Sequence, residues 1–154
     1  MSWQDKLRCV EPYVAGEQPK IVDMIKLNTN ENPYGPSEKV KEVLTNIDIE
    51  KLRLYPSSDA NTLRKALADY YNLDEKQVFL GNGSDEVLAL TFLTFFNGED
   101  PVLFPDITYS FYPVYCNLYQ INYQLVRLND DFSINVTDFN QPNSGIIFPN
   151  PNAP

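Results

Sequence analysis

The sequence contains no histidine, and its two cysteines form no CxxC pair. Without imidazole or paired thiols, the chain cannot build a zinc centre of the usual ligands, nor a catalytic triad with a histidine base. Another chain would have to supply those groups. Cys9 and Cys116 lie far apart in the sequence, so no disulfide or metal framework is expected from their spacing.

Positive charge is also scarce, with 12 Lys and Arg against 21 Asp and Glu and a net charge of −9. No long basic run offers a footprint for phosphate backbones, which disfavours nucleic acid and anionic membranes as partners. The longest apolar stretch, residues 87–96, is interrupted by threonines and is too short to span a bilayer. The first thirteen residues, MSWQDKLRCVEPY, have no apolar signal core, so a cytoplasmic location is expected.

Apolar residues are plentiful. The chain of 154 residues is 43% hydrophobic and 13% aromatic, which is enough for one sizeable buried core. Residues 1–30 resemble an arm, with a short helical turn around residues 3–9 followed by prolines and a glycine. Apolar residues at helical spacing predict one helix from Ser37 to about Ile47 and a second over residues 61–71.

After residue 76 the predicted elements alternate between strands and helices. Strands are expected at 77–80, 102–104, 121–128 and 145–148, and helices at 84–96 and 109–119, the second distorted by Pro113. This alternation predicts an α/β fold whose sheet is largely parallel. Ligands of such sheets gather beyond the carboxyl ends of the strands, so the loops at 81–86, 105–109 and 149–154 are the candidate site.

Each of these loops has two interpretations. GNGSDE (81–86) is either a turn whose Ser84 caps the next helix, or a phosphate cradle made of close-approaching glycines and free N–H groups. Tyr109, in PDITYSFY, is either a core aromatic or a platform for a flat ligand. The amides of PNPNAP are either ordinary turn residues beside proline or ligand contacts. That all three loops follow successive predicted strands favours the ligand interpretation.

Five strings, in this order, resemble the pyridoxal-phosphate-dependent aminotransferases of fold type I: LNTNENPYGPSEKV, YPSSDANTLRKALADYY, GNGSDEVL, PDITYSFYPVY and PNPNAP. Within that family, the arm EPYVAGEQP is similar to that of the histidinol-phosphate aminotransferases. The resemblance covers the whole chain. It implies that residues 1–30 are an arm joining the small domain and a dimer interface, and that residues 31–154 are the first half of the cofactor-binding large domain.

The resemblance also implies roles for individual residues. The backbone of Ser84 and Asp85 would hold the phosphate of pyridoxal 5'-phosphate, and Tyr109 would stack on its pyridine ring. Tyr55 would reach the cofactor phosphate of a neighbouring subunit, which implies a homodimer with shared active sites. Tyr13 would contact substrate from the arm.

Three further positions carry implied roles with open alternatives. Asn30 and Glu31 would lie near the substrate end of the cleft, or would only form a turn before Pro33. Asn152 would contact the ring hydroxyl. The family usually places that asparagine directly before a proline, where this chain has Ala153, so the contact is either shifted or absent.

The lysine that binds the cofactor covalently in this family lies beyond Pro154, so no catalytic residue is expected within the chain. The expected activity is transfer of an amino group from histidinol phosphate to 2-oxoglutarate, in histidine biosynthesis. The alternatives are a threonine-phosphate decarboxylase, an aminotransferase for aromatic amino acids, or a non-catalytic phosphate-binding or dimerisation module.

Overall fold

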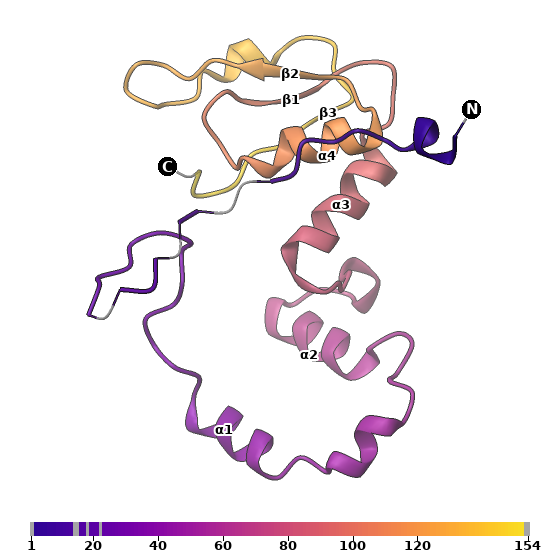
Figure 1. Ribbon diagram of the computed structural model, residues 1–154, viewed down its shortest axis with the longest axis vertical. Helices are drawn as coiled ribbons and strands as arrows, with labels where there is room; N and C mark the ends of the chain where they lie inside the picture. The colour runs from indigo at the N-terminus through magenta and orange to yellow at the C-terminus, as the bar shows by residue number, and fades with distance from the viewer. Residues whose placement is uncertain (1, 14–15, 18, 22, 153–154) are drawn as a thin grey trace. The chain divides into compact units, whose positions relative to one another are not determined.

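The computed structural model of the protein describes residues 2–13, 16–17, 19–21 and 23–152 (Figure 1). The described residues form two compact units. The first unit combines the residues up to Tyr13 with those from Gly81 onward, and the second comprises the residues up to Leu80 that lie between them. None of the described helices is long and apolar enough to cross a membrane.

The first unit is built on a parallel sheet whose described part has three strands in the order β2-β1-β3. β1 (Val102–Pro105) is central and pairs in parallel with β2 (Tyr123–Val126) and with β3 (Gly145–Ile146). Helix α3 (Gly83–Phe95) precedes β1, helix α4 (Phe111–Tyr119) connects β1 to β2, and the 3-10 helix η4 (Val136–Phe139) connects β2 to β3. The predicted α/β class is therefore confirmed.

Successive side chains of β1 point to opposite faces of the sheet, as the pleat requires. Val102 and Phe104 pack with Phe92 of α3 and with residues of α4 in the larger core cluster. Leu103 packs on the other face with Val126 and Phe139. All four residues of β1 are buried, which explains why this strand is a continuous apolar run rather than an alternating one.

The first residues of α3 and α4 are compatible with the start of a helix. Asn82 is the N-cap of α3, and Asp85 and Glu86 lie in its first turn, where carboxylates complement the positive end of the helix. Pro113 is the third residue of α4, a position whose N–H has no intrahelical acceptor, so the proline does not interrupt the helix.

The 3-10 helix η1 (Trp3–Lys6) also belongs to the first unit. It is capped by Ser2 and Asp5 in a reciprocal capping box. Two contacts attach this N-terminal segment to α4. The Arg8 guanidinium donates to the Leu118 carbonyl, and the Tyr13 ring packs against Phe111. In the structure, the residues up to Tyr13 group with the sheet in one compact unit.

The second unit consists of α1 (Glu38–Thr45), η2 (Ile49–Arg53), α2 (Asn61–Tyr71) and η3 (Glu75–Gln77) (Figure 1). Both predicted helices are present, and α2 has the predicted bounds. Within the described part of this unit, only Ala68 is buried, where α2 meets η3. The apolar residues of α1 are exposed.

The predicted strand at 77–80 is wrong. Asp74 caps η3 in a capping box with Gln77, so the segment begins with a helical turn and not with a strand. Val78 then has extended backbone, with φ −111° and ψ 117°, but no described strand pairs with it. An extended segment becomes a strand only when a neighbour accepts its backbone hydrogen bonds.

Three predicted elements are present with shifted bounds. The helix expected from Tyr109 begins at Phe111, because residues 106–110 form the loop that leaves β1. The strand expected over 121–128 is limited to Tyr123–Val126. The strand expected over 145–148 pairs only at Gly145–Ile146, followed by a hydrogen bond from the Ile147 N–H to the Leu103 carbonyl.

Candidate functional site

The loop Gly81–Asn82 brings the backbone unusually close to the first turn of α3. A Cβ added at residue 81 would lie 2.8 Å from Cγ2 of Val87, and Gly83 has φ +83°, a conformation that favours glycine. The Asn82 side chain makes no capping hydrogen bond. Among the described residues, no side chain accepts from the N–H groups of Ser84 or Asp85. These groups are therefore donors suited to an anion.

The two carboxylates beside these donors bond to neighbouring groups. The Asn82 N–H donates to Glu86 Oε2, which folds the glutamate back over the start of the helix. The Tyr109 hydroxyl donates to Asp85 Oδ1 at 2.8 Å. Both carboxylates thus accept hydrogen bonds from protein groups, which lowers the electrostatic obstacle they would present to an incoming anion.

The second loop, residues 106–110, leaves the carboxyl end of β1 and carries Tyr109. It is fixed at its start by Asp106, whose N–H donates to the Val126 carbonyl at 2.9 Å and whose carboxylate accepts from the Leu128 N–H at 3.0 Å. The half-buried Tyr109 ring is nearly parallel to that of Phe111, with centroids 6.0 Å apart, and meets Tyr112 edge-on.

The hydroxyl of Tyr109 stays protonated at neutral pH. Burial, followed by the hydrogen bond to the Asp85 carboxylate and its negative charge, raises the pKa of Tyr109 above its ordinary value. A neutral phenol donates to the carboxylate, so the bond fixes the plane of the ring relative to the first turn of α3.

The third loop leaves the carboxyl end of β3 and carries Asn152. Its amide nitrogen donates to the Ile107 carbonyl at 2.9 Å, and its amide oxygen accepts from the Thr108 hydroxyl at 2.7 Å. Since β1 and β3 are adjacent parallel strands, their following loops meet at one edge of the sheet. Ala153, which stands where the family usually has the asparagine, lies outside the described residues.

Tyr13 approaches the same region from the N-terminal segment. Its ring centroid lies 4.7 Å from that of Phe111, which in turn stacks beside Tyr109. The structure therefore brings together the predicted site residues of the first unit, which are Ser84, Asp85, Tyr109, Asn152 and Tyr13.

The family model described as Aminotransferase class I and II matches residues 22–154. The chain belongs to the class I and II aminotransferase family. The resemblance carried by the five sequence strings is thereby confirmed at the level of the family.

Several curated relatives of this aminotransferase chain are named histidinol-phosphate aminotransferase. The relative from Lactococcus lactis subsp. cremoris (strain SK11) is 62% identical over 154 residues, which is 100% of this chain and 43% of the relative. The relative from Lactococcus lactis subsp. lactis (strain IL1403) is 57% identical over the same coverage. One from Clostridium botulinum (strain Hall) is 57% identical over 152 residues, 99% of this chain and 43% of the relative. The chain thus spans less than half the length of these relatives.

The remaining predicted residues of the aminotransferase chain lie in the second unit. Tyr55 follows η2 and is fully exposed, at 101% of its reference area. Asn30 has left-handed backbone, φ 51°, in a turn before Pro33. Glu31 pairs with Lys26, and the hydrogen bond and charge of that lysine lower the pKa of the glutamate.

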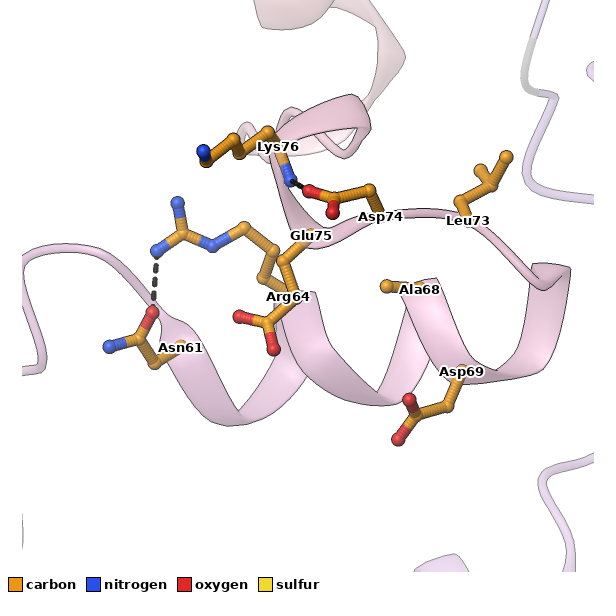
Figure 2. Close-up of a pocket in the computed structure, with 8 residues that line it drawn as sticks. All are labelled: Asn61, Arg64, Ala68, Asp69, Leu73, Asp74, Glu75 and Lys76. Atoms are coloured by element: carbon orange, nitrogen blue, oxygen red, sulfur yellow. Dashed lines mark hydrogen bonds between the residues drawn. The ribbon is translucent and has the colours of Figure 1, made fainter.

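The second unit also carries a cavity of about 520 Å³ between α2 and η3, which holds none of the predicted site residues (Figure 2). Some of its ionic groups make local hydrogen bonds. Arg64 donates to the Asn61 side chain at 2.7 Å, and Asp74 caps η3. Its lining is mixed in charge, with two bases among the eight residues Asn61, Arg64, Ala68, Asp69, Leu73, Asp74, Glu75 and Lys76. This cavity therefore does not present the chemistry of a cofactor site.

One further residue lies at the site of this aminotransferase chain and is not among those predicted from the sequence. Tyr115 of α4 is buried, and its hydroxyl donates to the Asp85 backbone carbonyl at 3.0 Å, with Asp85 Oδ1 at 3.5 Å. The available signal was spacing, since Phe111, Tyr112 and Tyr115 share one face of a helix. That spacing predicts a buried ring but does not reveal the partner of its hydroxyl.

Proposed function

We propose that this chain forms the N-terminal part of a pyridoxal-phosphate-dependent enzyme that transfers the amino group of histidinol phosphate to 2-oxoglutarate. The observation that carries the proposal is 62% identity along the whole chain to relatives named histidinol-phosphate aminotransferase. Membership of the class I and II aminotransferases, a family that generally uses pyridoxal phosphate, supports the reaction type.

The residues at the sheet edge fit a phosphate attached to a flat ring. The donors of Ser84 and Asp85 lack a side-chain cap, and a Cβ added at Gly83 would meet no described atom within 4 Å, so there is open space beside them. Tyr109 supplies an aromatic ring tied to the same turn. When bound, pyridoxal phosphate supplies an electron sink for the bonds at the substrate's α-carbon.

Each of the predicted site residues in the three loops then has a binding or orienting role. The N–H groups of Ser84 and Asp85 bind the phosphate at the positive end of α3. Tyr109 stacks on the ring and excludes water from its face. Asn152 holds the loop that carries Tyr109 through its two bonds to residues 107 and 108, and the second proton of its amide nitrogen remains for the ring hydroxyl.

The residues that contact substrate and partner complete the proposal. Tyr13 reaches substrate from the N-terminal segment, and Asn30 and Glu31 serve as further substrate-binding residues. Tyr55 serves the phosphate site of a second copy in a homodimer, a role that its complete exposure supports. A cytoplasmic location is supported by the two unpaired thiols, Cys9 and Cys116.

Covalent attachment of the cofactor needs a lysine that this part of the protein does not provide at the site. Residues 81–154 contain no lysine, and their one basic residue is Arg127. Residues 81–154, which carry the phosphate donors and Tyr109, therefore do not supply the lysine that binds the cofactor and moves the α-proton.

The test is an assay of purified full-length gene product with histidinol phosphate and 2-oxoglutarate, following glutamate formation. Turnover of histidinol phosphate well above that of phenylalanine or tyrosine is expected. Release of carbon dioxide from threonine phosphate would instead indicate the decarboxylase. Phosphate binding without turnover of any of these substrates would indicate a non-catalytic module.

A further inference from the structure

Tyr115 has a buried hydroxyl that the proposed function does not use. The residue is only 3% exposed, and its ring lies against Phe92, with centroids 5.3 Å apart. Phe92 and Asp85 are seven residues apart on α3, so they lie on the same face of that helix. One side chain of α4 thus contacts α3 at two levels, through its ring in the core and through its hydroxyl at the first turn.

The hydroxyl bond is directed at the part of α3 that would hold the phosphate. Its acceptor is the backbone carbonyl of Asp85, at 3.0 Å, and the carboxylate of the same residue lies 3.5 Å away. A phenol has one proton, so the shorter bond to the carbonyl dominates. A backbone acceptor matters here, because the Asp85 carbonyl belongs to the peptide plane that joins Asp85 to Glu86. The preceding plane, joined to it at the Asp85 Cα, carries the Asp85 N–H that would face the anion.

Two tyrosines therefore converge on Asp85 from α4 and from the loop before it. Tyr109 bonds to the carboxylate and Tyr115 to the backbone, so the side chain and the main chain of Asp85 are held independently. Burial, and after it the charge and hydrogen bond of Asp85, raises the pKa of Tyr115 to about 12. The hydroxyl thus keeps its proton and donates throughout the physiological range.

We propose that Tyr115 is a positioning residue for the cofactor site, whose hydroxyl fixes the first turn of α3 relative to the ring of Tyr109. The inference rests on the proposed function, because it assigns the phosphate to the N–H groups of Ser84 and Asp85. Tyr115 itself touches neither cofactor nor substrate. It determines the spacing between the phosphate donors and the aromatic platform, which a single rigid ligand must span.

The same helix offers a matched control. Tyr112 is equally buried, at 3% exposure, and packs against the same Phe92, with centroids 5.8 Å apart. Within the described residues its hydroxyl has no hydrogen bond to α3. Tyr115→Phe and Tyr112→Phe therefore each remove one hydroxyl from a buried tyrosine while keeping the ring, and only the first removes the bond to Asp85.

The experiment titrates cofactor-free full-length gene product with pyridoxal phosphate and, separately, with pyridoxal, which has no phosphate. Tyr115→Phe should weaken binding of pyridoxal phosphate about fivefold, the effect of one lost hydrogen bond, and leave pyridoxal binding unchanged. Tyr112→Phe should change neither affinity. Equal weakening of both ligands would mean a general structural role and would overturn the proposal, as would an unchanged affinity for pyridoxal phosphate.

Hydrogen exchange on the ligand-free protein provides a second readout that needs no cofactor. The amides of residues 86–89, the first in α3 with intrahelical acceptors, should exchange faster in Tyr115→Phe than in Tyr112→Phe, because the first turn of α3 has lost its anchor. Identical exchange in the two variants would overturn the positioning role alone. Wild-type protein that binds pyridoxal phosphate no better than pyridoxal would overturn the proposed function, and this inference with it.

Discussion

Replacement of Gly81 by alanine tests whether the close approach of the loop sets the position of α3. The added Cβ would lie 2.8 Å from Val87 Cγ2 and 3.1 Å from Glu86 Oε2. Carbon atoms in ordinary contact are about 3.5–4.0 Å apart, so one group must move by about 1 Å. Val87 is β-branched and stiff at χ1 within the helix, so we expect the loop and the first turn of α3 to move.

Two effects of this movement can be measured. Forcing an extra carbon into a tight contact typically costs about 1–3 kcal/mol, and because residue 81 is exposed we expect the lower half of that range. If Ser84 and Asp85 hold the phosphate as proposed, the movement also shifts their N–H donors away from it. We therefore expect affinity for pyridoxal phosphate to fall roughly tenfold, the equivalent of about 1.4 kcal/mol.

Two other glycines provide the comparison. An alanine Cβ at Gly35 would meet no described atom within 4 Å, and its backbone is outside the left-handed region. Gly35→Ala should leave cofactor affinity unchanged and stability unchanged or raised by about 0.4–1 kcal/mol. Gly83→Ala also meets no described atom within 4 Å, but φ is +83°, so it should lose roughly 1–2 kcal/mol through backbone strain alone.

The assay is urea unfolding and cofactor titration of the full-length gene product for all three variants. The expected order of affinity for pyridoxal phosphate is Gly35→Ala equal to wild type, with Gly81→Ala clearly weaker. The reasoning would be refuted if Gly81→Ala matched Gly35→Ala in both unfolding midpoint and cofactor affinity, because the contact with Val87 would then carry no consequence.

Three further outcomes are expected. Phe92→Ala should lower the free energy of unfolding by about 3–5 kcal/mol, because Phe92 is fully buried among the rings of the larger core cluster, and a urea-unfolding loss below about 1.5 kcal/mol would contradict this. Tyr55→Phe should weaken cofactor retention about fivefold without changing the unfolding midpoint, since its side chain is fully exposed; unchanged retention in dialysis would argue against a role across a dimer interface. The 154-residue chain alone, incubated with pyridoxal phosphate and reduced with borohydride, should show scattered or no lysine labelling and no turnover of histidinol phosphate. A single stoichiometric adduct at one lysine, together with turnover of histidinol phosphate, would contradict this prediction.

Local sequence signals predicted several elements well because those elements depend on neighbours a few residues away. Helix α2 spans residues 61–71 as its apolar spacing predicts, and β1 is the expected apolar run. The strand prediction at 77–80 failed because it also relied on a local pattern. Asp74 and Gln77 form a capping box, which is a local signal for a helical turn. Pairing of a strand depends instead on a distant neighbour, which no local pattern reveals.

The sequence by itself determined the α/β class, the family and the three loops that carry the candidate site residues, because helix and strand periods, turn residues and motif order are properties of short segments. Only the tertiary structure decided which groups within those loops meet. The Tyr115 hydroxyl reaches a carbonyl 30 residues away, and the amide of Asn152 engages Thr108 across 44 residues. Such contacts arise from packing α4 against α3 and from placing β1 beside β3, so the side-chain pairs exist only once the parallel sheet has brought its carboxyl ends to one edge.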